Sequence, residues 1–235
     1  MTLRGISKTS YHLPNGIKSE KEYLNWLELN GYGYLESVMT YNKGLYGDDW
    51  TKMGENVFTE PSSNTDHDGE IYKWIEETFW YKKGRQKFLN VGSNVGYMDI
   101  SMAKRKAFDM VVGMDASMML VGYARMLTCK FDITGVRFDH GDALHMTYAD
   151  KEFDTVYCQH VLEHLPSVYE ALKEQSRVGK VVCGFVPHRE ISENAEHIYT
   201  FTEESLGNVM RELFEHHEMK LSSDGKILGY GGWNG

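Results

Sequence analysis

From residue 86 onward, short apolar runs alternate with amphipathic stretches. The apolar runs predict strands at about 87–91, 109–114, 135–139, 153–158 and 180–186. The stretches between and after them predict helices at about 96–107, 117–130, 165–177 and 203–215, the last with Thr202 as its cap. Strands separated by helices of this length imply a parallel sheet with helices on both faces.

The two ends of the chain depart from this alternation. The tail, which reads "MKLSSDGKILGYGG" at 219–232, predicts a hairpin that adds antiparallel pairing at one edge. The first 85 residues are rich in aromatics and glycine, and helices fit 19–31 and 68–82 with a loop between them. We therefore expect a Rossmann-like, doubly wound α/β domain at 86–235, with a mostly parallel seven-stranded sheet, and an N-terminal helical lid at 1–85.

The composition narrows the class of protein. Of the 235 residues, 41% are hydrophobic and 25% charged, which is typical of a globular domain. The net charge of −9 argues against a nucleic-acid partner, and no apolar run reaches the length of a membrane helix. The N-terminus lacks the apolar core of a signal peptide. Three widely spaced cysteines, at 129, 158 and 183, favour a reduced, cytoplasmic protein. The sequence leaves a homo-oligomer open.

A polar turn with two glycines follows the first predicted strand, in "FLNVGSNVGYMDI" at 88–100. Gly92 permits a sharp turn, and Gly96 removes a side chain where the helix begins, so that the backbone can approach a ligand and the helix N-terminus can present free N–H groups. The turn lacks the glycines of a dinucleotide fingerprint and the Gly-Lys-Ser/Thr of a P-loop. The alternative is a tight strand–helix connection with no ligand.

Two acids follow the next two strands. Asp115 ends the second strand, where a carboxylate can accept both ribose hydroxyls of an adenosine. Asp142 lies just past the third strand, within reach of an adenine amino group. Either acid alone is better explained as an exposed loop residue. Together with Gly92, they predict an adenosine site at the carboxyl ends of three strands.

Two further segments carry a resemblance to a known family. The fourth strand leads into "CQHVLEHLPSVYEALKEQSRVGKVV" at 158–182, and "EHIYTFTEESLGNVM" follows at 196–210. Over residues 86–215 the chain resembles class I S-adenosylmethionine-dependent methyltransferases, of the small-molecule type. It departs from that pattern at Asn90, where the family usually has an acid, and at Asn94, where the family usually has glycine.

The resemblance implies S-adenosylmethionine as the cofactor and S-adenosylhomocysteine as its product. The positions that match the family's cofactor-binding segments are Asn90, Gly92, Ser93, Asn94, Gly96, Asp115, Ala116, Asp142, Ala143 and Gln159. Asn90 can accept a hydrogen bond but adds no negative charge. Asn94 tolerates the turn conformation better than most residues.

Histidines are the candidate catalytic bases. His160 and His164 lie four residues apart, which would place them on one helix face, and His197 and His188 follow the fifth strand. Each is equally well explained as a local hydrogen-bonding residue. The predicted helix offers no third ligand, so we expect no metal. Glu163 would orient a neighbouring group.

The sequence therefore favours methyl transfer to a hydroxyl or amine of a small molecule. The aromatic residues of the N-terminal segment either contact the acceptor or form a small core. They are Tyr32, Tyr34, Tyr41, Tyr46 and Trp50. One alternative is a cofactor-binding regulatory or scaffold protein without turnover, which Asn90 and Asn94 keep open. A nicotinamide-dependent oxidoreductase is disfavoured by the missing third glycine and by the lack of a Tyr-x-x-x-Lys pair.

Overall fold

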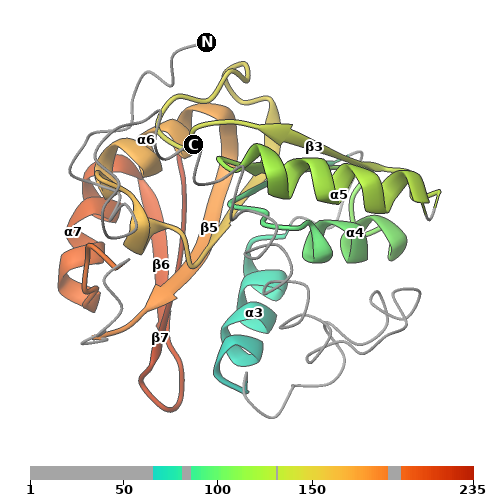
Figure 1. Cartoon of the computed structure of the whole chain (residues 1–235). Helices are drawn as coiled ribbons and strands as arrows, with labels where there is room; N and C mark the ends of the chain where they lie inside the picture. Colours follow the sequence, from blue (N-terminus) through green and yellow to red (C-terminus); the bar gives the residue numbers. More distant parts are fainter. Residues whose placement is uncertain (1–65, 81–85, 131, 190–196) are drawn as a thin grey trace, which may run out of the picture.

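The computed structural model describes residues 66–80, 86–130, 132–189 and 197–235 (Figure 1). Within these residues seven strands form one sheet: β1 (Lys87–Val91), β2 (Met110–Asp115), β3 (Val136–His140), β4 (Phe153–Gln159), β5 (Gly179–Pro187), β6 (His216–Leu221) and β7 (Ile227–Trp233). The helices are α3 (Asp66–Thr78), α4 (Tyr97–Lys104), α5 (Met118–Lys130), α6 (Val168–Val178) and α7 (Glu203–Leu213), with a short 3-10 helix, η1 (Leu162–His164).

The strand order is β3-β2-β1-β4-β5-β7-β6. The first five strands in this order pair in parallel, and β7 pairs antiparallel with both β5 and β6. The predicted mostly parallel, seven-stranded sheet with an antiparallel C-terminal edge is therefore confirmed. The chain winds outward from β1 to β3 and then returns to β4, so the strand order reverses between β1 and β4. Ligands of open α/β sheets bind in the crevice at such a reversal.

Helices cover both faces of the sheet (Figure 1). On one face α6 packs on β4 and β5 and α7 packs on β6, with Leu172, Leu206 and Met210 fully buried. On the other face α3 and α4 share one apolar cluster, and α5 packs beside α4 around Phe138 of β3. Apolar side chains of β1, β2, β4, β5 and β7 enter both layers, as a parallel sheet covered on both faces requires, whereas the edge strands β3 and β6 each contribute to one layer.

Local signals fix several helix ends. The hydroxyl of Thr202 accepts a hydrogen bond from the N–H of Ser205, and the Ser205 hydroxyl accepts one from the N–H of Thr202, so the predicted cap of α7 is confirmed as a reciprocal capping box. At the end of α6 no turn intervenes, because β5 begins at Gly179, directly after the last residue of the helix. A Cβ at Gly179 would overlap the Val156 side chain, so close packing requires glycine at this junction.

Part of the N-terminal segment belongs to the core. The helix α3 begins at Asp66, within a segment that the sequence predicted to be loop, and it packs against β7. Ile71 and Ile75 are fully buried there. The predicted helix at 19–31 and the aromatic residues of the expected lid lie outside the described residues. No helix in the described ranges is long and apolar enough to cross a membrane.

Candidate functional site

The turn between β1 and α4 has left-handed backbone geometry at three positions. The φ angles are 78° at Gly92, 53° at Asn94 and 79° at Gly96. Side chains disfavour this region, and asparagine is among the few residues that enter it readily. The side-chain oxygen of Asn94 also accepts a hydrogen bond from the N–H of Val95, at 2.7 Å. Asparagine at 94 therefore preserves the turn.

The amides of this turn find their partners within the chain. Gly92 and Ser93 donate to the carbonyl of Met114, Asn94 donates to Asp115, Val95 donates to the side chain of Asn94, and Gly96 donates to the carbonyl of Ser93. The N–H groups of the turn before α4 are therefore satisfied within the chain, and the free N–H groups expected at the N-terminus of the helix itself stay a prediction. A Cβ at Gly92 would overlap Val161, and one at Gly96 would overlap Phe138. The glycines thus serve the packing of the turn itself.

The two predicted acids lie at the carboxyl ends of neighbouring strands. Asp115 ends β2, and its carboxylate accepts the N–H groups of Asn94 and Ser117, both at 2.8 Å. Burial raises the pKa of Asp115, against the effect of these two hydrogen bonds. Asp142, just past β3, accepts the N–H of Leu144 at 2.9 Å, and its carboxylate lies 3.2 Å from the Nδ1 of His145. The fold brings Gly92, Asp115 and Asp142 to one rim of the sheet.

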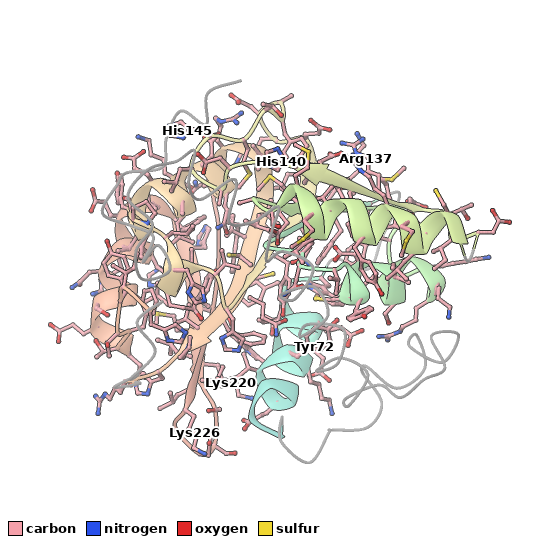
Figure 2. The ribbon with its side chains drawn as sticks, viewed as in Figure 1. Tyr72, Arg137, His140, His145, Lys220 and Lys226 are labelled. Carbon is pink, nitrogen blue, oxygen red and sulfur yellow. The ribbon has the colours of Figure 1, made fainter. Side chains whose placement is uncertain are left out.

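The remaining predicted cofactor residues lie along this rim. The Ser93 hydroxyl is buried and has no hydrogen-bond partner among the described residues. The carbonyl of Ala116 accepts a hydrogen bond from His140, Ala143 is buried in the core, and the side chain of Gln159 accepts the O–H of Tyr157. In Figure 2, His140 and His145 lie near the end of β3, far from Lys226 on the β6–β7 turn.

A buried acid beneath the turn was not predicted from the sequence. Asp99 in α4 is fully buried, and its carboxyl oxygen accepts a hydrogen bond from the side-chain amide of Asn90, at 3.0 Å. Burial raises the pKa of Asp99 to about 7. An acid at position 90 would face this carboxyl, whereas the Asn90 amide donates to it. The available signal was one acidic residue within the otherwise uncharged stretch "YMDISMA" of α4.

A pocket of about 500 Å³ lies at the carboxyl ends of β4 and β5. Its lining comes from the exits of these strands, the start of β7 and the segment before α7: His160, Glu163, His164, Pro187, His188, Arg189, His197, Lys226 and Ile227. All of the predicted catalytic histidines line this pocket. A pocket of this volume is in the range that small-molecule ligands occupy.

The local geometry of His160 and His164 differs from the prediction. His160 precedes η1 and has a positive φ of 50°, whereas His164 ends that short helix. The two histidines therefore do not share a regular helix face. Glu163 between them is 1% exposed, and its carboxylate lies 3.2 Å from the Nδ1 of His160. The expectation that Glu163 orients a neighbour fits this contact.

Long-range hydrogen bonds bring His197 to the same place. The N–H groups of Ile198 and Tyr199 donate to the carbonyl of Glu163, at 2.8 and 3.4 Å. The Tyr199 hydroxyl donates to the carbonyl of Pro166 at 2.9 Å. As a result the rings of His164 and His197 lie 4.8 Å apart between centroids. No sequence pattern predicted this approach, because the two histidines are far apart along the chain.

His188 has a defined tautomer in its neutral form. Its Nδ1 lies 2.8 Å from the carbonyl oxygen of Gly225, which can only accept, so Nδ1 carries the proton. The Nε2 is buried and has no partner in the part of the chain that the structure describes. In the neutral ring this nitrogen is an acceptor, as a general base requires.

Comparisons with known proteins find methyltransferases. The methyltransferase domain family matches residues 89–182. The uncharacterised methyltransferase YcgJ of Bacillus subtilis is 26% identical over 98 residues, which are 42% of this chain and 38% of that protein. A crystal structure of YcgJ has a TM-score of 0.60 at 13% identity and covers 72% of this chain and 99% of that one.

Two further similar proteins have names that include their small-molecule ligands. A demethylmenaquinone methyltransferase of Staphylococcus saprophyticus is 28% identical over 141 residues, 54% of this chain and 60% of that protein. A Haemonchus contortus phosphoethanolamine N-methyltransferase, bound to phosphomonomethylethanolamine and S-adenosylhomocysteine, has a TM-score of 0.58 at 14% identity and covers 73% of this chain and 58% of that one. The chain spans 33% to 60% of the length of the first curated relatives it matches.

Proposed function

We propose that the chain transfers a methyl group from S-adenosylmethionine to a hydroxyl or amine of a small molecule. The premise is that the chain belongs, through residues 89–182, to the class I S-adenosylmethionine-dependent methyltransferases. One observation carries this proposal. The rim that holds Gly92, Asp115 and Asp142 borders, across the β1–β4 reversal, a pocket lined by histidines. A cofactor site and an acceptor site would thus lie side by side.

The residues at the rim suit an adenosine. The Asp115 carboxylate uses one lone pair on each oxygen for backbone N–H groups, so each oxygen retains capacity for a ribose hydroxyl. The buried Ser93 hydroxyl without a partner supplies a further polar group. Asp142 keeps 37% of its side chain exposed and would accept from the adenine amino group.

The pocket residues would position and activate the acceptor. The cofactor supplies a methyl group already activated by the positive charge of its sulfonium, so the chain has chiefly to align the acceptor and exclude water. A hydroxyl or protonated amine also has to lose a proton. His188, with its buried Nε2, and His160, whose Nδ1 lies beside Glu163, would accept that proton.

The pocket also suggests the character of the acceptor. Arg189 and Lys226 add positive charge to a lining with one acid, Glu163, which favours an acceptor with an anionic or electron-rich group. The acceptors named for the two similar methyltransferases are likewise small molecules. The free thiols of Cys129, Cys158 and Cys183 are consistent with the cytoplasmic location that we propose.

Calorimetry with S-adenosylmethionine, and with nicotinamide cofactors as the comparison, tests this function. We expect one S-adenosylmethionine per chain and no binding of the nicotinamides. Asp115→Ala should weaken cofactor binding by about 1–3 kcal/mol, because charge-assisted hydrogen bonds to the ribose are lost. The control Glu204→Ala removes an exposed carboxylate from α7 and should bind as the unaltered protein does.

Turnover then separates the enzyme from the alternatives. Methyl transfer from isotopically labelled cofactor into small hydroxyl or amine acceptors is the expected result. Cofactor binding without transfer to any acceptor would instead indicate a regulatory or scaffold protein. Unchanged affinity in a folded Asp115→Ala variant would remove the ribose assignment.

A further inference from the structure

We propose that Glu163, His164 and His197 bind a divalent transition-metal ion of the zinc type at the wall of the pocket. One ligand atom from each of these residues lies within 4.8 Å of the other two. The three side chains also line the same pocket of about 500 Å³. The sequence predicted no metal because one helix offered no third ligand. The tertiary structure supplies that ligand from the segment before α7.

The distances suit a site that closes around its ion. Zinc binds imidazole nitrogen and carboxylate oxygen at about 2.0–2.2 Å, so the ligand atoms of a tetrahedral site lie about 3.4 Å apart. The ligand atoms lie within 4.8 Å of one another, and we expect side-chain rotation to bring them to this spacing. His164 and His197 are both half-buried and face the pocket, which leaves room for such rotation.

The state of Glu163 points independently to a cation. This side chain is 1% exposed, and its Oε2 has no hydrogen-bond partner among the described residues. A buried carboxylate oxygen without a partner costs free energy unless a cation or a donor reaches it. The other oxygen, Oε1, lies 3.2 Å from the Nδ1 of His160, which would fix the orientation of the carboxylate as groups around metal ligands do.

The backbone fixes the relative position of the three ligands. The carbonyl of Glu163 accepts N–H groups from Ile198 and Tyr199, the two residues after His197. The hydroxyl of Tyr199 donates to the carbonyl of Pro166, two residues after His164. These contacts join the two ligand-bearing segments on both sides of the proposed site. Preorganisation of this kind is what separates a binding site from a chance cluster.

The ligand set selects the class of ion. Two imidazoles and one carboxylate suit zinc, iron, cobalt or nickel, whereas magnesium and calcium prefer sites made of oxygen. Three protein ligands leave at least one coordination position for another molecule. In an extension that rests on the proposed function, this open position faces the pocket and binds the hydroxyl oxygen of the acceptor. The site thus favours a hydroxyl over an amine acceptor.

The experiment measures metal binding by the full chain, without an affinity tag and after chelator treatment. Calorimetry with Zn²⁺ should show one ion per chain with a Kd of about 1 µM or tighter. Titration with Co²⁺ should give visible absorption bands of a four- or five-coordinate site, and Mg²⁺ should not compete. Glu163→Gln and His197→Asn should each weaken Zn²⁺ binding by about 100-fold or more, because each removes a direct ligand.

A matched control removes a histidine elsewhere. His216 stacks on Trp233 at the start of β6, at the opposite rim of the sheet, so His216→Asn should bind Zn²⁺ as the unaltered protein does. Thermal unfolding of each variant checks the fold, and His197→Asn serves if the buried Glu163→Gln variant does not fold. The proposal is overturned if the unaltered protein takes up no stoichiometric Zn²⁺ or Co²⁺, or if folded His197→Asn binds them unchanged.

The same samples separate this proposal from the proposed function. Calorimetry with S-adenosylmethionine on metal-free protein reports the cofactor site alone. Cofactor binding without metal uptake would overturn the metal site and leave the methyltransferase proposal standing. Metal uptake without cofactor binding would support the metal site and contradict the function proposed above.

Discussion

The rim of the sheet has two halves that are built differently. One half lies at the carboxyl ends of β1, β2 and β3 and contains the turn that holds Gly92. Each N–H from Gly92 to Gly96 has a partner within the chain. Over β4, β5 and β7 lies the open pocket, where Glu163 and His188 each keep a buried polar atom without a partner among the described residues. In the first half the backbone of the turn is fully paired, and the remaining bonding capacity lies in the side chains of Asp115 and Ser93. In the second half the unpartnered atoms belong to side chains that line a pocket.

This contrast suggests a division of work between the two halves. A cofactor shared by many methyltransferases needs a rigid surface, and a turn with internally satisfied hydrogen bonds provides one. An acceptor that differs between these enzymes is better bound by side chains on loops, which can vary without disturbing the sheet. Single substitutions can test whether the first half is rigid and whether long-range contacts assemble the second.

The strongest test of the closed half is Gly92→Ala. The left-handed φ at this position costs alanine about 1–2 kcal/mol, and overlap of its Cβ with Val161 adds about 1–3 kcal/mol. We expect the free energy of unfolding to fall by about 4 kcal/mol, measured by denaturation in urea. Gly122→Ala is the control, since this helical glycine has open space around it and alanine there should stabilise by about 0.5–1 kcal/mol. A loss below about 1 kcal/mol in Gly92→Ala would contradict a rigid turn.

The second test concerns the acid beneath the same turn. Because burial raises the pKa of Asp99 to about 7, the native state keeps a proton that the unfolded chain releases near pH 4. The free energy of unfolding that Asp99 contributes is thus present at low pH and is lost as the pH rises toward about 7. Asp99→Asn cannot titrate, so its stability relative to the unaltered protein should increase by about 3 kcal/mol between pH 5 and pH 8.

Urea denaturation of both proteins across this pH range measures the effect. Asp132→Asn, at an exposed position, is the control and should show no pH-dependent difference from the unaltered protein. A constant difference between Asp99→Asn and the unaltered protein would mean that Asp99 is ionised in the native state.

The smallest effect tests the open half. Tyr199→Phe removes the hydroxyl that joins the segment of His197 to Pro166, and one hydrogen bond of this kind contributes about 1 kcal/mol. We expect Zn²⁺ affinity to fall about fivefold, as measured by calorimetry, while the affinity for S-adenosylmethionine stays unchanged. Tyr169→Phe on α6 is the control. Equal loss of both affinities would show that the two halves of the rim are coupled rather than independent.

Much of the fold followed from local pattern. The strand at 87–91 was predicted with its observed ends, and the other predicted strands lie within one residue of the observed ones, because each buried strand is a short apolar run between turn signals. The end of α4 was less well predicted, since it ends at Lys104 and the residues that follow it are also good helix formers. The first residues of α3 were read as loop because polar residues are common in both settings.

The candidate site also has residues that the sequence predicted and residues that it did not. Gly92, Asp115 and Asp142 were found from sequence because each follows directly after a strand, and the carboxyl ends of parallel strands meet at one edge. Asp99 was missed because its burial depends on the packing of α4 on the sheet. His197 was not recognised as part of the proposed metal site, because spacing along one segment cannot show an approach between distant segments.

Local sequence patterns were sufficient to predict the order of strands and helices, the family of the fold and the residues of the turn between β1 and α4, because all of these depend on interactions between near neighbours. Which histidines lie close together depends on the tertiary structure. His164 and His197 come together because the Glu163 carbonyl accepts hydrogen bonds from a distant segment. Such a contact exists only once the sheet has set the two segments side by side.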